Sequence, residues 1–290
     1  MTPKKIPLGY IELDNGIKAI TAMNDLFLSH MFNNPENWEA LRDSVNIILD
    51  KYKQINPDTT VTLVTGKIIV ETQYKYLMSV DNTTKDQDIK MAAESDLTYI
   101  EFQNRTKTNP PLETRSVEYF GLGVGHSKGK TANQIWLLAE DLESVLHGKI
   151  FARYILKDET TGEPHPGGSG ILYVNLSKLA EEKCPAGELS GFLLGTVTDP
   201  QNEKVKEIAK RFNAGFETFK ADKEAIKMMS LRERAKNEGW IEGLEEGEAR
   251  GEIKGSIATV NELLELVKLG FSLEEASQKI MSKYTLQEEN

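Results

Sequence analysis

Apolar and polar positions alternate most clearly in the middle of the chain, where two short runs flank a polar break. The first run begins at Asp88 and continues Ile-Lys-Met-Ala-Ala, and the second reads Thr-Tyr-Ile-Glu-Phe-Gln from Thr98 to Gln103. Two such runs joined by a few polar residues are typical of a β-hairpin. Ile100 and Phe102 give the second run an apolar face. The pattern therefore predicts an antiparallel strand pair with one side buried.

Helical spacing of apolar residues appears on both sides of this predicted hairpin. Before it, residues 21–50 are expected to be helical, with Pro35 starting a second helix because its missing N–H costs nothing there. After it, a helix is expected to carry Arg115 and Tyr119 on one face, since they are four residues apart. Later helices are predicted at 202–219 and 223–236.

Short apolar runs between these helices predict further strands, at 134–139, 150–156 and 170–176. Residues 59–80 are rich in β-branched and aromatic side chains and fit either a helix or a strand. The first 230 residues are thus expected to form one α/β domain, with helices before and after a small sheet.

The C-terminal tail has a different pattern from the body. From 231 to 257, glycine recurs at every fourth position between charged residues, at Gly239, Gly243, Gly247, Gly251 and Gly255. Each glycine costs a helix about 1 kcal/mol relative to alanine, so this segment is either a charged connector or a helical self-association stalk. Residues 258–290 predict a small helical hairpin that serves docking or dimerisation.

Composition narrows the class of protein. The 290 residues are 39% hydrophobic and 28% charged, as in an ordinary globular protein. No apolar run approaches the roughly 20 residues that span a bilayer, so no membrane partner is expected. Cys184 is the single cysteine, which excludes an internal disulfide and a cysteine-based metal cluster. A cytoplasmic location is the expectation.

The charge is acidic overall and unevenly distributed. The net charge is −10, which argues against strong non-specific binding of nucleic acid. Of the 35 basic and 45 acidic residues, 8 and 13 lie from Leu231 onward, so the short tail carries −5 and the long body the other −5. The body can still hold a local basic patch.

The predicted hairpin also carries the candidate chemistry. Glu101 and Gln103 share one strand face, and an even-numbered loop would set Asp88 opposite one of them. Two acids and an amide on one patch of sheet supply the hard oxygen ligands of a divalent metal. The alternative is a solvated sheet face, which acidic and amide residues also mark. Against that alternative, Asp is a poor strand former and falls inside a predicted strand.

In their order along the chain, these features resemble the recombination-promoting nuclease (Rpn) family, also called PD-(D/E)xK family transposases. The resemblance spans nearly the whole chain. Its features, in order, are Asn24-Asp25-Leu-Phe, Asp88, Glu101-Phe-Gln103, Arg115 with Tyr119, Gln134-Ile-Trp-Leu-Leu, Ile171 to Leu179, and the glycine tail followed by Leu-Gly-Phe-Ser-Leu-Glu-Glu-Ala. It implies a restriction-endonuclease-like core, a central mixed sheet flanked by helices, with a helical C-terminal extension.

The resemblance also implies Mg²⁺-dependent cleavage of DNA, or cleavage with another divalent cation, in proteins linked to mobile elements or phage defence. Asp88 matches the metal-binding aspartate, Glu101 the second acid, and Gln103 the position that holds lysine in the wider motif. Asp25 is the nearest match to an acid of the first helix, and Tyr119 is a further auxiliary candidate.

Arg115 is a candidate phosphate ligand, because its planar guanidinium matches the oxygens of a phosphate. Its alternative role is a salt bridge to Glu113 or Glu118 on the same helix.

The leading hypothesis is thus a Mg²⁺-dependent DNA endonuclease that dimerises through its C-terminal helices. The second is a weak or inactive family member that acts as an oligomerising, regulatory protein. A third, an unrelated α/β hydrolase with two carboxylates, fits the acids but leaves the glycine tail unexplained.

Overall fold

The computed structural model describes most of the first 231 residues. The described ranges are 6–13, 16–65, 69–77, 84–92, 96–104, 107–108, 110–125, 130–165 and 168–231, with the backbone alone at 71–77, 84–92 and 96. Contacts within the chain separate two compact units, Met1–Met229 and Ser230–Asn290. The predicted connector at 231–257, apart from its first residue, and the predicted helical hairpin at 258–290 lie outside the described residues and stay predictions.

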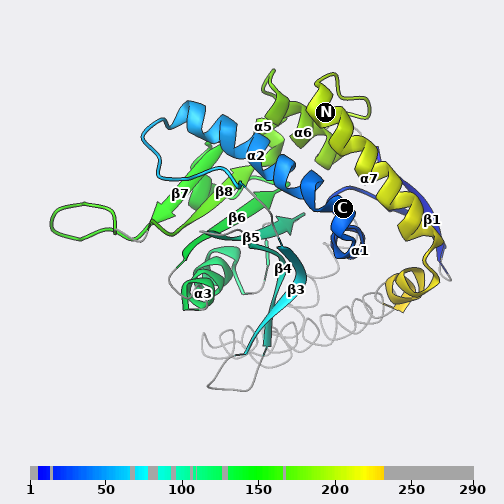
Figure 1. Ribbon diagram of the computed structural model, residues 1–290, viewed down its shortest axis with the longest axis horizontal. Coiled ribbons are helices and arrows are strands. Elements are labelled where there is room, and N and C mark those ends of the chain that lie inside the picture. The colour runs from blue at the N-terminus through cyan, green and yellow to red at the C-terminus, as the bar shows by residue number, and fades with distance from the viewer. Residues whose placement is uncertain are drawn as a thin grey trace, which may run out of the picture. The chain divides into compact units, whose positions relative to one another are not determined.

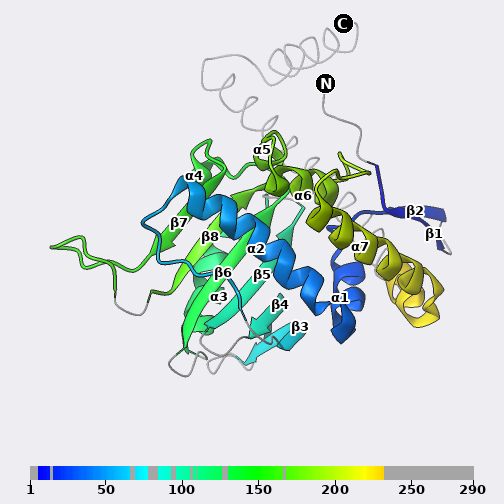
Figure 2. The same ribbon diagram turned by 45° about the horizontal axis from the view of Figure 1, so that its top comes forward.

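A six-stranded mixed sheet forms the centre of the first unit (Figures 1 and 2), in the order β3-β4-β5-β6-β8-β7. The strands are β3 (Ile69–Leu77), β4 (Thr84–Ala92), β5 (Asp96–Gln103), β6 (Thr131–Leu138), β7 (Phe151–Ile155) and β8 (Gly170–Asn175). The strands β5, β6 and β8 run parallel to one another, and β4 and β7 pair antiparallel with their neighbours.

Helices cover both faces of this sheet, which confirms the predicted α/β class. The described helices are α1 (Asp25–Asn33), the 3-10 turn η1 (Pro35–Asn37), α2 (Trp38–Ile55), α3 (Leu112–Gly125), α4 (Glu143–Leu146), α5 (Leu176–Leu179), α6 (Pro185–Leu194), α7 (Glu203–Ala221) and a last segment at 223–231. Figure 1 shows α2 and α3 on opposite sides of the strands.

The alternation of side chains along the strands decides which helices each face contacts. Ile100 and Phe102 belong to the large core shared with α1, α2, α6 and α7. Trp136 and Tyr173 point the other way and pack with α3 and α4. Every residue of β8 is buried, as expected for a parallel strand covered on both faces.

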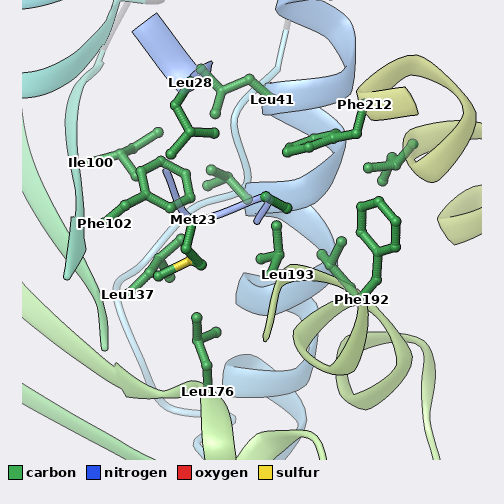
Figure 3. Close-up of a cluster of buried hydrophobic side chains, with 14 of the residues drawn as sticks. Met23, Leu28, Leu41, Ile100, Phe102, Leu137, Leu176, Phe192, Leu193 and Phe212 are labelled. Atoms are coloured by element: carbon green, nitrogen blue, oxygen red, sulfur yellow. The ribbon is translucent and has the colours of Figure 1, made fainter. Parts of the chain in front are cut away.

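Aromatic packing fixes α1 against α7. The ring of Phe27 lies 5.8 to 6.3 Å from the ring centres of Phe212, Phe216 and Phe219 on α7. On the side of α1 that faces the sheet, Figure 3 shows Leu28 next to Ile100 of β5. The first helix is therefore held between α7 and the strands that carry the candidate acids.

Several elements differ from the sequence prediction. The two helices expected over 21–50 are present as α1 and α2, but the 3-10 turn η1 separates them, because Asn34 ends α1 and its side chain caps the turn that begins at Pro35. Residues 69–77 of the ambiguous segment form a strand. A separate two-stranded hairpin, β1 (Gly9–Leu13) and β2 (Gly16–Ile20), was not anticipated, and neither was α6. No helix in the described part of the chain is long and apolar enough to cross a membrane.

Candidate active site

The strands that carry the candidate acids separate where those acids lie. β4 and β5 pair at four positions, from Ala92↔Leu97 to Ile89↔Ile100, which confirms the predicted hairpin. One further step in the same register sets position 88 opposite Glu101. Beyond these four β4–β5 pairs, the pairs that the structure describes join β4 only to β3 and β5 only to β6. The sheet therefore forks at Asp88 and Glu101.

Glu101 and Gln103 extend from β5 toward the face covered by α3, because they alternate with Ile100 and Phe102. Glu101 is 1% exposed and has interaction partners within the fold. Gln103 is half-buried at the end of the strand, where its backbone carbonyl accepts a hydrogen bond of 2.8 Å from the Ala139 N–H. The side chain of Asp88 lies outside the described residues, so only its backbone position is known.

Arg115 lies over two aromatic rings on the same face. Its Cζ is 5.6 Å from the ring centre of Tyr119 and 5.8 Å from that of Trp136. Trp136 is the direct neighbour of Glu101 in the parallel β5–β6 ladder. The structure therefore brings Arg115 and Tyr119 to the strand position beside Glu101, and both predicted residues share one helix face.

The alternative predicted for Arg115 was a salt bridge to Glu113 or Glu118 on the same helix. Among the described residues, Arg115 forms no ion pair with Glu113 or Glu118, and Glu113 instead accepts a hydrogen bond from Ser144. A guanidinium above aromatic rings is stabilised by the ring quadrupole while its N–H groups stay available at the edge. Arg115 thus keeps the donors that a phosphate would need.

Asp25 is placed differently from the other candidates. It is an exposed residue in the first turn of α1, which packs on the opposite face of the sheet from Glu101. The segment before α1 nevertheless meets the end of β5, because the Asn104 side-chain amide donates to the Met23 carbonyl at 2.9 Å. Asp25 therefore lies on the other layer, two residues along the chain from a contact with the end of β5.

The donor chemistry of these residues fits a hard divalent cation. A carboxylate at Glu101 and an amide oxygen at Gln103 are the oxygen ligands that Mg²⁺ prefers, and the register adds Asp88. Among the described residues no group of three His, Cys, Asp or Glu could hold a metal. A complete ligand set would need Asp88, whose side chain is outside that description.

Two contributors to the site were missed from the sequence. Trp136 supports Arg115, but its position beside Glu101 depends on the parallel pairing of β5 with β6, which spacing does not encode. Asn104 directly follows Gln103, and its partner Met23 lies far away in sequence. A hollow of about 520 Å³ lies elsewhere, between α2 and α7. Its charged lining is mostly acidic, including Glu39, Asp43, Asp50, Glu203 and Glu207.

Comparisons with protein-family models, with curated proteins and with solved structures find no match to this chain.

Proposed function

We propose that the chain is a Mg²⁺-dependent DNA endonuclease with a restriction-endonuclease-like core, as the resemblance to recombination-promoting nucleases implies. The fork in the sheet is the observation that carries the proposal. The described β4–β5 ladder ends at Ile89 and Ile100, and one further step in the same register would bring the backbone of Asp88 opposite Glu101. In this proposal the cation is held between the two strands, beside the end of their shared ladder.

Each candidate has a distinct role in this proposal. Asp88 and Glu101 hold the cation, and Gln103 orients a water or a phosphate oxygen by hydrogen bonding, since an amide carries no charge. Bound Mg²⁺ supplies a Lewis acid that lowers the pKa of a water ligand and stabilises charge on the phosphate. Arg115 binds a phosphate oxygen through the N–H groups at the edge of its guanidinium. The ring of Tyr119 holds the guanidinium of Arg115 by a cation–π contact.

A second candidate function is a family member that binds its partners without cutting DNA. The burial of Glu101, at 1% exposed, favours it, since a metal ligand in a hydrolytic site must also meet water. The amide at Gln103 favours it as well, because the charge of a lysine is missing there. A DNA-cleavage assay distinguishes the endonuclease from the non-cleaving protein.

The test is nicking of supercoiled plasmid in Mg²⁺ and in EDTA. We expect Mg²⁺-dependent nicking by the natural protein and a loss of at least about 100-fold in Asp88→Asn and Glu101→Gln, because each removes a carboxylate that would hold the cation. Asp50→Asn on α2 is the matched control, since it removes an exposed carboxylate in the other helical layer.

Three outcomes would contradict the proposal in different ways. Nicking that persists in EDTA would exclude a metal-dependent reaction. Equal nicking by the natural protein and both site variants would show that the acids are assigned wrongly. Absence of nicking in Mg²⁺ and in Mn²⁺ would favour the non-cleaving candidate.

A further inference from the structure

Polar side chains gather at the amino-terminal end of the parallel strands, on the face of the sheet that α2 covers. Thr98 of β5 pairs with Asn133 of β6, and Asn133 pairs with Gly170 of β8. Side chains alternate between the two faces of a strand, so Thr98 and Asn133 lie on the same face as Ile100. A hydroxyl and an amide are therefore neighbours here, next to a position without a side chain.

The side chain of Arg153 on β7 takes the space above Gly170. A Cβ added at Gly170 would lie 3.3 Å from the Arg153 Nε. The Arg153 Nη1 donates to the hydroxyls of Thr59 at 3.2 Å and Thr60 at 3.0 Å, and Nη2 donates to the Gly168 carbonyl at 2.9 Å. A guanidinium has five N–H groups, so these three bonds leave two N–H groups for other acceptors.

The charge of Arg153 is not neutralised by the protein. Arg153 is half-buried, its three partners are neutral oxygens, and among the described residues no carboxylate pairs with it. Burial lowers the pKa of the Arg153 guanidinium, because the cation loses part of its hydration there. Buried charges in proteins are paired as a rule, so this cation is one that a nearby anion would stabilise.

The three polar side chains line one hollow of about 10 Å³, together with Gly170 and with Leu49 of α2. Thr98 is 4% exposed, and its hydroxyl has no hydrogen-bond partner among the described residues. An enclosed hydroxyl without a partner costs free energy, so the hollow is built to hold a group that accepts its hydrogen bond. The volume is close to that of one water molecule, which admits a single small ion and excludes a nucleotide.

We propose that this hollow binds a small inorganic anion, chloride in solution, between Arg153, Asn133 and Thr98. Each of the three supplies a donor: a guanidinium N–H, an amide N–H and a hydroxyl. A water in the same place would satisfy the hydroxyl and leave the charge of Arg153 uncompensated. The bound anion connects β5, β6 and β7 at one point, so it stabilises this end of the sheet. The site is independent of the proposed cleavage of DNA.

The experiment follows the thermal unfolding of the full-length protein as chloride replaces gluconate at constant ionic strength, since gluconate is too large to enter the hollow. We expect the unfolding temperature of the natural protein to rise by about 2 to 4 °C between about 10 mM and about 300 mM chloride. Thr98→Val keeps the shape of the side chain without its hydroxyl, so the rise should disappear. Arg153→Gln should also lose the rise. Thr196→Val is the control and should keep it, because that hydroxyl donates to the Gly191 carbonyl away from the hollow.

Two further measurements separate an anion from a water. In gluconate, Thr98→Val should be at least as stable as the natural protein, because the hydroxyl it lacks is enclosed without a partner. Crystals grown in NaBr should show anomalous density between the Arg153 guanidinium and the Thr98 hydroxyl. An equal rise with chloride in the natural protein and in Thr98→Val would show a general effect of the salt and overturn the inference. No rise, or no bromide density at this position, would show that the hollow holds water only and would overturn it too.

Discussion

Tyr173 on β8 has a phenol enclosed between the sheet and α3. Its side chain is 3% exposed, and its hydroxyl is hydrogen-bonded to the Ser116 hydroxyl, which also donates to the Glu113 carbonyl. Burial raises the pKa of Tyr173 to about 12, because the phenolate would lose its hydration there. As the pH rises, the Tyr173 hydroxyl therefore ionises at a lower pH in the unfolded chain than in the folded one.

The raised pKa of Tyr173 makes the stability of the fold depend on pH. Between about pH 10 and about pH 12, the unfolded state releases the Tyr173 proton while the folded state keeps it, so the free energy of unfolding falls as the pH rises. We expect the stability advantage of the natural protein over Tyr173→Phe to shrink by about 1 kcal/mol between about pH 9 and about pH 11. Urea unfolding at the two pH values measures this change.

Tyr154→Phe is the control for this measurement, since its hydroxyl belongs to a half-exposed side chain on the neighbouring strand β7. A stability difference between natural protein and Tyr173→Phe that is constant with pH would contradict the role assigned to burial.

At the scale of single residues, the sequence predicted where the candidate side chains lie along the strands. The alternation of Glu101 and Gln103 with apolar residues was enough to give them a common face. Trp136 and Asn104 could not be predicted as contributors, because their contacts depend on which strands are neighbours. Asp25 was found by resemblance, and the packing of α1 places it on the other layer from Glu101.

At the scale of elements, α3 approaches the sheet closely because it carries a glycine at the contact. A Cβ added at Gly123 would lie 2.9 Å from the ring of Tyr99, which is 1% exposed and cannot turn away. Gly121 is on the open side of the same helix, where an added Cβ would meet nothing within 4 Å. Gly123 therefore allows the close approach of α3 to the sheet, whereas Gly121 has no such packing role.

Alanine at these two positions should have opposite effects. Gly123→Ala forces α3 away from the sheet, so we expect the free energy of unfolding to fall by about 1 to 3 kcal/mol. Gly121→Ala adds helix propensity without a clash, so we expect a gain of up to about 1 kcal/mol. Urea denaturation of both variants measures the difference, and equal effects would exclude close packing as the reason for Gly123.

Elements with a clear period were predictable, and buried or short ones were not. The β4–β5 hairpin and the helices α2 and α7 follow from alternation and from amphipathic spacing. The helix α6 is buried over most of its residues and lacks a polar face, so its sequence has no stripe to detect. β1 and β2 are five residues each, too short for a decisive pattern.

At the scale of the whole molecule, the acidic tail is expected to oppose DNA binding. Residues from Leu231 onward include 8 basic and 13 acidic residues, a net charge of −5. A chain ending at Leu231 should therefore bind duplex DNA several-fold more tightly at low salt, and the gain should disappear as salt screens the repulsion. Fluorescence anisotropy at about 50 mM and about 200 mM salt measures both effects.

A full-length variant with glutamine at Glu245, Glu246 and Glu248 is the control for this truncation, since it removes charge and keeps the tail. If the truncated chain and the natural one bind equally at low salt, the tail has no electrostatic influence on the body.

The fork in the sheet has a mechanical consequence. The β3–β4 hairpin is paired along most of its length, whereas the described residues show four pairs that join it to the remaining four strands. Fewer pairs hold the sheet together here than along the neighbouring ladders, so we expect the hairpin and the four-stranded part to unfold locally as separate units. Backbone amides of the β3–β4 hairpin and those of the other four strands should then exchange their hydrogens with solvent at different rates. The sheet would hinge along the line that runs between Asp88 and Glu101.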